Sequence, residues 1–371
     1  MSKRRKIITI SLSSFFLLVI ALILFAVLSP WPTIWIARSS FAKDAKKNFI
    51  ERTNIDSLNV TVSEELSYDL EAKKSTRSTF NIIYPNDNAN NLPIIIFVHG
   101  GAFIAGDKSD NQNYLMKLSS EGYIIFNINY GLAPDNKYPT ALIQLSKMYR
   151  YVLSNELTLE NQFNIEMDAN TIFLGGDSAG ANIVSLFALI ETNPNYISQT
   201  EVLKAHKEEF NIPGINIKGI FLFCGAYDLN AFKSFTGGLK FVVNHIGRGL
   251  TGKWDWQKSN VVNEMSLFIR ESDNNYKHYI TSDYPPVYIT DGSETASFST
   301  QGKTFATLLK DVGIDVTGKF YPELRHEFQF MLENVDSDNN LSYDEKQKID
   351  NCVIAANEVF TNVVSFLNTP K

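Results

Sequence analysis

Cysteine is scarce in this chain, with only Cys224 and Cys352 among 371 residues. The two cysteines do not have metal-ligand spacing, so no cysteine-rich zinc framework is present. Long basic clusters are also absent beyond the extreme N-terminus, and the formal net charge is −6. This charge distribution argues against nucleic acid as a partner. The sequence also contains no internal repeat.

The remaining composition is that of a folded protein. Hydrophobic residues make up 44% of the 371 residues and charged residues 20%. A chain of this size can form one large α/β domain of about 300 residues with additional segments attached to it.

The N-terminus has the pattern of a membrane anchor. Residues 3–6 are Lys-Arg-Arg-Lys, and residues 7–28 contain no charge. These 22 residues would form a helix of about 33 Å, enough for a bilayer core of about 30 Å. We therefore expect a cytoplasmic tail over 1–6 and a single transmembrane anchor over 7–28. The catalytic domain would then lie outside the cell membrane.

A cleaved signal peptide is the alternative for this segment. Its apolar region is usually about 7–15 residues long and is followed by a small-residue cleavage site. No such site precedes Ser29-Pro30, so the uncleaved anchor is favoured.

Strand and helix patterns alternate after a linker and N-terminal cap region over 29–74. The continuous apolar run over 92–98 is typical of a strand buried on both faces. A helix pattern near 111–121, a strand pattern over 123–130 and a helix pattern over 141–153 follow it. The alternation predicts a mostly parallel, doubly wound α/β sheet within a domain over 75–371.

Ser178 occupies a sharp bend between a short apolar strand, 171–174, and a helix pattern over 179–191. Gly176 and Gly180 lie two residues to either side of it, giving the Gly-x-Ser-x-Gly spacing of a nucleophile elbow. The glycines are needed because a strained turn leaves no room for side chains there. We therefore expect Ser178 to be a nucleophile.

Residues 99–103, His-Gly-Gly-Ala-Phe, follow the buried strand over 92–98. Consecutive small residues in such a loop can bring backbone N–H groups toward a developing oxyanion. We interpret His99 as a brace for this loop and not as the catalytic base.

Four segments together resemble the hormone-sensitive-lipase-like carboxylesterases of the α/β-hydrolase superfamily. They are residues 99–103, 130–134, 138–139 and 176–180, and the resemblance extends over about 75–367. It implies an eight-stranded core, a cap insertion over 228–284 and no metal or organic cofactor. It also implies that the amides of Gly101, Ala102 and Ala179 form the oxyanion hole. Ala102 stands where many relatives have a third glycine, but alanine retains the amide.

His326 is the expected general base. Among the five histidines it alone follows a late strand-like run, 315–320. In this fold the histidine comes last among the triad residues. The segment also resembles the His-x-Phe element of the same family.

The carboxylate that orients the base is ambiguous. Relatives usually have an aspartate three residues after the glycine that ends the penultimate strand, and here that residue is Thr295. Glu294 is our first candidate, Asp291 the second and Asp228 the third; loss of the acid is the remaining possibility. Threonine itself carries no charge that would stabilise an imidazolium.

These observations predict a membrane-anchored serine hydrolase that works through an acyl-enzyme. The resemblance to the carboxylesterases implies that its substrates are short- to medium-chain carboxylic esters. Its expected partners are a small-molecule ester and, through 7–28, the membrane. Two alternatives are a deacetylase of an extracellular glycan and a non-catalytic binding protein that has lost its triad acid.

Overall fold

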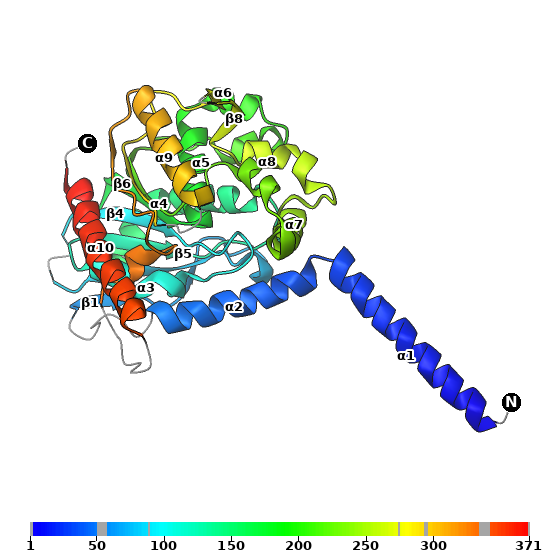
Figure 1. The fold of residues 1–371 in the computed structure, drawn as a ribbon. Coiled ribbons are helices and arrows are strands. Elements are labelled where there is room, and N and C mark those ends of the chain that lie inside the picture. Colours follow the sequence, from blue (N-terminus) through cyan, green and yellow to red (C-terminus); the bar gives the residue numbers. More distant parts are fainter. Residues whose placement is uncertain are drawn as a thin grey trace.

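The computed structural model describes residues 3–49, 58–87, 90–273, 275–292, 296–333 and 342–369. Figure 1 shows a rounded domain from which one long helix, α1, projects. The C-terminal helix, α10, lies on the opposite side of the domain from the point where α1 leaves it.

The centre of the domain is one sheet of nine strands, counted over the described residues, in the order β1-β3-β5-β4-β6-β7-β10-β11 with β2 beside β3. Strand β3 pairs antiparallel with β1, β2 and β5, and all other neighbours are parallel. The strands are β1 Val60–Val62, β2 Leu66–Ser67, β3 Thr79–Pro85, β4 Leu92–Val98, β5 Ile124–Ile128, β6 Met167–Asp177, β7 Ile217–Phe223, β10 Val287–Thr290 and β11 Val316–Thr317.

The predicted mostly parallel sheet is confirmed, but the expected number of eight strands is wrong. The additional strand is the two-residue β2, in which Leu66 pairs with Phe80. Such a short pairing, which gives backbone groups beside β3 hydrogen-bond partners, has no periodicity that a sequence could reveal.

Helices cover both faces of the sheet and form much of the cap (Figure 1). The α-helices are α1 Lys3–Leu28, α2 Trp31–Phe49, α3 Gln112–Ser119, α4 Thr140–Phe163, α5 Ala179–Thr192, α6 Pro194–Ser198, α7 Gly237–Thr251, α8 Asn260–Glu264, α9 Ala296–Asp311 and α10 Tyr343–Asn368. A hairpin of β8 Phe268–Ser272 and β9 Asn275–His278 also belongs to the predicted cap region, 228–284.

Strand β4 shows why the run over 92–98 is continuously apolar. Ile94, Ile96 and Val98 belong to the core cluster on one face of the sheet. Ile95 and Phe97 belong to the cluster on the other face, together with residues of α3 and α10. Because side chains alternate along a strand, both sets must be apolar when helices cover both faces.

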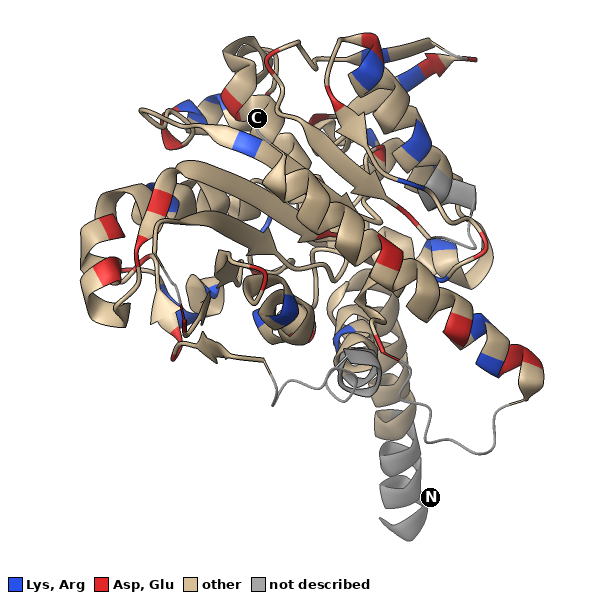
Figure 2. Ribbon diagram, turned by 90° about the vertical axis from the view of Figure 1, so that its left-hand side faces the viewer, with Lys and Arg blue, Asp and Glu red and all other residues tan. Residues whose placement is uncertain are grey.

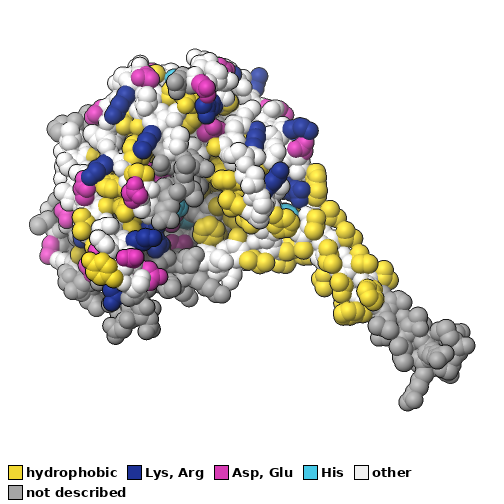
Figure 3. Space-filling view, viewed as in Figure 1, with side chains coloured by type: hydrophobic (Ala, Val, Ile, Leu, Met, Phe, Trp, Pro, Cys, Tyr) yellow, Lys and Arg dark blue, Asp and Glu magenta, His cyan; other side chains and the backbone are white. Residues whose placement is uncertain are grey.

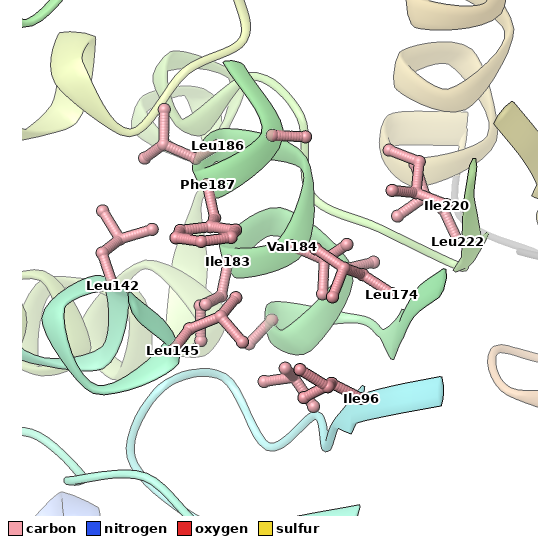
Figure 4. Close-up of a cluster of buried hydrophobic side chains, with 14 of the residues drawn as sticks. Ile96, Leu142, Leu145, Leu174, Ile183, Val184, Leu186, Phe187, Ile220 and Leu222 are labelled. Atoms are coloured by element: carbon pink, nitrogen blue, oxygen red, sulfur yellow. The ribbon is translucent and has the colours of Figure 1, made fainter. Parts of the chain in front are cut away.

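Helix α5 is the central helix of the larger cluster. Figure 4 shows its side chains between Leu142 and Leu145 of α4 and Leu174, Ile220 and Leu222 of the sheet. Every residue from Ala179 to Ile190 is buried. The helix that follows Ser178 is therefore fixed along nearly its whole length.

Helices α1 and α2 meet the domain at their junction. Ile34 is fully buried, and the Arg38 guanidinium donates hydrogen bonds to the carbonyls of Ile104 and Ala133 at 2.6 and 2.9 Å. Among the described side chains, no helix alone is both long and apolar enough for a membrane span. Ser14–Leu28 and Trp31–Ala42 reach that measure only as a pair, bent by 69°.

Charged residues are concentrated on the outer helices and loops. Figure 2 shows acidic and basic residues interspersed on this side of the molecule, while the strands carry few. The two cysteines are both buried and free, so they do not form a disulfide.

Candidate active site

Ser178 lies between β6 and α5, as the sequence predicts. Its backbone has φ 49° and ψ −112°, a conformation that L-residues rarely adopt. The Ser178 N–H donates to the Phe223 carbonyl at 2.7 Å, which fixes the bend against β7. The side chain is only partly buried, so its hydroxyl remains available to a ligand.

Steric constraints explain why glycine occupies the two positions that flank Ser178. A Cβ on Gly176 would lie 2.6 Å from the Gly180 carbonyl carbon, and a Cβ on Gly180 would lie 2.0 Å from the Val98 carbonyl oxygen. Neither contact is possible without displacing backbone. The elbow therefore requires both glycines for close packing of α5 on β4.

The loop after β4 has an unusual backbone. Gly101, Ala102 and Phe103 have φ values of 107°, 52° and 63°. A side chain on Gly101 would place its Cβ 2.2 Å from the Ala105 carbonyl oxygen. Ala102 retains its amide in this left-handed conformation, and both Ala102 and Ala179 line the same cavity as Ser178. The three predicted oxyanion residues thus lie in the elbow and the loop beside it.

His99 braces this loop. The imidazole is buried, lies 2.7 Å from the Gly100 carbonyl through Nδ1, and stacks on Tyr130 with 4.4 Å between ring centroids. The Tyr130 hydroxyl also donates to the His99 carbonyl at 3.1 Å. Burial lowers the pKa of His99 to about 4, so the ring is neutral at physiological pH.

His326 reaches the nucleophile from the other side. Its Nε2 lies 3.2 Å from the Ser178 Oγ, within the range in which a base accepts a proton from a hydroxyl. The two residues are 148 positions apart in sequence, and the loop after β11 brings them together.

Asp291 is a candidate carboxylate from the sequence that lies close to this pair. It follows β10, and an oxygen of its side chain, the Cys224 Sγ and a ring nitrogen of His326 all lie within 4.8 Å of one another. Burial raises the pKa of Asp291 to about 6, while His326 and the Cys224 thiol oppose that increase. Asp291 is therefore mostly ionised at neutral pH beside the imidazole.

Backbone contacts hold Asp291 against the histidine loop. The Tyr321 N–H donates to the Asp291 carbonyl at 2.8 Å. A Cβ on Gly292 would lie 2.3 Å from the ring of Phe328, so the turn after Asp291 packs tightly on the segment after His326. Glu294, the first candidate from sequence, and Thr295 lie outside the described residues.

Asp228, the third candidate, caps a short helix in the cap region. Its Oδ1 accepts hydrogen bonds from the Asn230 N–H at 2.9 Å and from the Ser266 hydroxyl at 3.5 Å. These contacts give the carboxylate a structural role at the start of the 3₁₀ turn Leu229–Ser234.

Two further carboxyl groups beside the pair were not identified from the sequence. Asp177 is buried and accepts a hydrogen bond from the Asn111 amide at 2.7 Å. Burial and the neighbouring Glu327 carboxylate raise the pKa of Asp177 well above its usual range. Glu327 Oε1 also lies 3.7 Å from the His326 Nε2. The raised pKa favours the neutral form of Asp177, which adds no negative charge beside the expected oxyanion.

The only sequence signal for this pair was position. Asp177 directly precedes Ser178, and Glu327 directly follows His326. If Ser178 and His326 are in contact, their sequence neighbours Asp177 and Glu327 must also be close to each other. The sequence alone reveals this only if the contact between Ser178 and His326 is already known.

A cavity of about 260 Å³ opens above Ser178. Its lining, as far as the described residues form it, is almost entirely apolar and contains no charged side chain. Helix α7 forms one wall, and Trp256 lines the cavity while Trp254 does not. Such a lining suits an aliphatic chain better than a sugar or a charged group.

Cys224, Asp291 and His326 are the described donors that come close enough together to hold a metal ion. Cys224 is fully buried, and burial raises the pKa of its thiol. A metal would require the thiolate, so this environment fits a hydrogen-bonding thiol better than a metal ligand.

Comparison with known proteins agrees with this arrangement. A family model described as the alpha/beta hydrolase fold matches residues 95–330. Probable carboxylesterase 3 of Arabidopsis thaliana is 27% identical over 161 residues, 41% of this chain and 49% of the relative. Esterase LipQ of Mycobacterium tuberculosis is 26% identical over 240 residues, 64% of this chain and 50% of the relative. The chain thus spans about half the length of these two relatives.

Among solved structures, esterase B from Lactobacillus rhamnosis has a similar fold. The TM-score is 0.63 at 18% identity, covering 90% of this chain and 96% of the esterase. At this level of identity the likeness concerns the fold.

Proposed function

Because the chain belongs to the hormone-sensitive-lipase-like carboxylesterase branch of the alpha/beta-hydrolase superfamily, we propose that it is a serine hydrolase of carboxylic esters. The observation that carries this proposal is the 3.2 Å approach of His326 Nε2 to Ser178 Oγ at the floor of an apolar cavity.

The reaction follows from the roles of these groups. Ser178 attacks the ester carbonyl as His326 takes its proton, and the amides of Gly101, Ala102 and Ala179 stabilise the oxyanion. The protonated His326 then gives the proton to the departing alcohol, leaving an acyl group on Ser178. Water activated by His326 releases the acid and restores the enzyme.

For the third member of the triad we propose Asp291. Its support is the distance of at most 4.8 Å from a carboxylate oxygen to a ring nitrogen of His326. An ionised carboxylate beside the imidazole fixes its orientation and stabilises its positive charge. Glu294 is the competing residue. Substituting Asp291 and Glu294 one at a time distinguishes which of them orients His326.

The apolar cavity favours an aliphatic acyl group as the substrate part that lies against α7. A cavity of about 260 Å³ whose described lining carries no charge provides few hydrogen-bonding partners for a glycan. We therefore favour ester hydrolysis over deacetylation of a polysaccharide.

We also propose that residues 7–28 anchor the protein in the cell membrane with the hydrolase domain outside. The support is the basic segment 3–6 ahead of an uncharged run. Protease added to right-side-out membrane vesicles should degrade the domain. Complete protection of the domain would place it on the other side.

The catalytic proposal is tested with full-length protein in detergent micelles. Wild type should hydrolyse p-nitrophenyl acetate and butyrate with a burst, and Ser178→Ala should lose about 10⁴-fold or more in kcat. Ser198→Ala, at an exposed serine of α6, is the matched control and should retain activity. A wild type with neither burst nor turnover would favour the non-catalytic alternative.

A further inference from the structure

Helix α7 separates the cavity from the N-terminal helices. Leu239, Val243 and Leu250 lie on one face of this helix and line the cavity. On another face, His245 Nδ1 lies 2.9 Å from the Thr33 hydroxyl and Nε2 lies 3.2 Å from the Val27 carbonyl. One helix therefore forms both the wall of the cavity and the contact with the α1–α2 junction.

The cavity reaches the surface on this side. Leu239 lines the cavity and yet is 53% exposed, so it lies at the cavity mouth. Other large apolar side chains are exposed on α7, just after α7 and on the neighbouring helix α2. We call the following set the apolar collar: Trp35 (54% exposed), Ile36 (70%), Leu239 (53%), Phe241 (44%) and Trp254 (58%).

Contacts link the collar to α1. Phe241 packs edge-on against His245 with 4.3 Å between the ring centroids, and His245 contacts the Val27 carbonyl of α1. Arg248 donates to the same Val27 carbonyl at 3.3 Å and lies 3.5 Å above the Trp254 ring. Figure 3 shows apolar side chains continuing from the projecting helix onto the part of the domain that it meets.

The charges near the collar are mainly positive. Helix α7 contains Lys240 and Arg248 and no acidic residue, and Lys253 follows it. Arginine and lysine beside exposed tryptophan are the side chains that suit the headgroup region of an anionic bilayer. A protein partner is less suitable because the collar adjoins α1, whose described apolar side chains are largely exposed.

We propose that the apolar collar rests on the lipid bilayer and that acyl chains enter the cavity from the membrane past Leu239. The substrates would then be esters dissolved in the bilayer, such as acylglycerols or other long-chain lipid esters. This inference rests on the proposed esterase function and identifies the phase from which its substrate comes.

The physical advantage is partitioning. Each added methylene favours the membrane over water by about fourfold, so long-chain esters are rare in solution. A cavity whose mouth touches the bilayer receives the chain without transferring it through water. A soluble short ester needs no such route, and this difference makes the proposal testable.

The first test measures the turnover of two substrates by the full-length protein in vesicles of phosphatidylcholine and phosphatidylglycerol. The double variant Phe241→Asp/Trp254→Asp places two charges in the collar without altering cavity-lining residues. Turnover of 4-methylumbelliferyl oleate in the vesicles should fall about tenfold or more, while p-nitrophenyl butyrate hydrolysis changes less than twofold. Ile354→Asp, at a 68% exposed residue of α10, is the matched control and should change neither.

Four outcomes overturn the inference or its basis. Equal loss with both substrates, or no loss with the oleate ester, removes the membrane route. A wild type that hydrolyses butyrate in solution but not the vesicle-borne oleate ester refutes the inference and leaves the esterase proposal intact. A wild type inactive on both refutes the esterase proposal itself.

A second measurement does not depend on catalysis. Both native cysteines are buried, so a single introduced cysteine can be labelled. An environment-sensitive fluorophore at Phe241→Cys should shift to the blue and be quenched by spin-labelled lipids, whereas one at Ile354→Cys should not. Unchanged aqueous emission at Phe241→Cys, or a shift that depends on protein concentration and not on lipid, would overturn membrane contact and indicate self-association.

Discussion

The floor of the site and its α7 wall are built in different ways. The floor consists of strand ends and tight turns, where Ser178 and Ala102 have rare backbone conformations and Gly180 has no room for a methyl group. The wall is a regular helix that presents apolar side chains, and its position depends on packing against the N-terminal helices. The floor requires particular residues, whereas the wall requires only a suitable face. Changes in the floor should therefore remove the chemistry, and changes in the wall should alter which substrate is used.

After the loss of Ser178 itself, the largest effect is expected at the orienting carboxylate of the floor. Asp291→Asn should lower kcat for p-nitrophenyl butyrate by about 10³- to 10⁴-fold, because a neutral amide neither stabilises the imidazolium nor fixes the required tautomer. Stopped assays with full-length protein of verified folding would measure it.

Glu294→Gln is the matched control for this prediction. It should retain activity within about threefold if Asp291 is the acid. The reverse pattern, a severe loss in Glu294→Gln and a mild one in Asp291→Asn, would assign the role to Glu294. Similar mild effects in both would mean that the floor works without an orienting carboxylate.

A methyl group provides the next test, because it can be added to floor and wall alike. Gly180→Ala should remove most activity or prevent folding, since its Cβ would lie 2.0 Å from the rigid Val98 carbonyl oxygen. Gly249→Ala in α7 would meet the flexible end of Ile34 at 3.1 Å and Pro134 at an ordinary contact distance of 3.5 Å. That variant should stay active and can gain up to about 1 kcal/mol of stability from helix propensity.

Thermal denaturation and butyrate hydrolysis of both variants would measure the contrast. An active, stable Gly180→Ala would show that α5 can move away from β4. In that case the steric account of the elbow would be wrong.

The difference between the strained turns of the floor and the regular helix of the wall explains which features could be predicted from the sequence. The elbow and the loop over 99–103 followed from local patterns, because backbone strain permits few residue types there. The alternation of strands and helices followed from the periodicity of apolar residues. The structure places His326 next to Ser178, as its position after a late strand predicts. The continuous apolar strand over 92–98 likewise reflected two covered faces.

The remainder depended on contacts between distant segments. The short strand β2 exists only because β3 offers it a partner. Helix α7 begins at Gly237-Gly238, a dipeptide that is typical of a turn. Its helical conformation therefore depends on tertiary packing. The proximity of Asp291 to His326 comes from pairing of the segments after β10 and β11. Spacing along the chain could not choose between Asp291 and Glu294.

The α7 wall should control the length of the acyl chain that the enzyme accepts. Val243→Trp adds a large side chain to the cavity lining and should lower kcat/KM for p-nitrophenyl octanoate about tenfold or more, with little change for acetate. Val242→Trp is the matched control because Val242 is the adjacent residue and does not line the cavity. Parallel losses with acetate and octanoate would show that α7 affects the floor and not the acyl chain.

The smallest effect on activity is expected at the far end of α5, the helix that begins beside Ser178. Glu191 has a buried oxygen without a hydrogen-bond partner among the described residues, and burial raises its pKa to about 8. Its folded-state pKa exceeds the unfolded value of about 4.5, so the stability that proton binding provides is complete below pH 4.5 and lost as pH rises through 8.

Glu191→Gln removes this titration and should therefore raise stability at pH 9 by on the order of a few kcal/mol, with no gain at pH 4.5 and no change in butyrate turnover. Thermal denaturation at both pH values measures it, and Glu208→Gln, at an exposed glutamate, should leave the pH dependence unaltered. A Glu191→Gln protein that is no more stable than wild type at pH 9 would mean that the carboxylate finds compensation in the folded state. A gain in stability together with unchanged turnover would show that a buried charge on the same helix as Ser178 costs stability without contributing to catalysis.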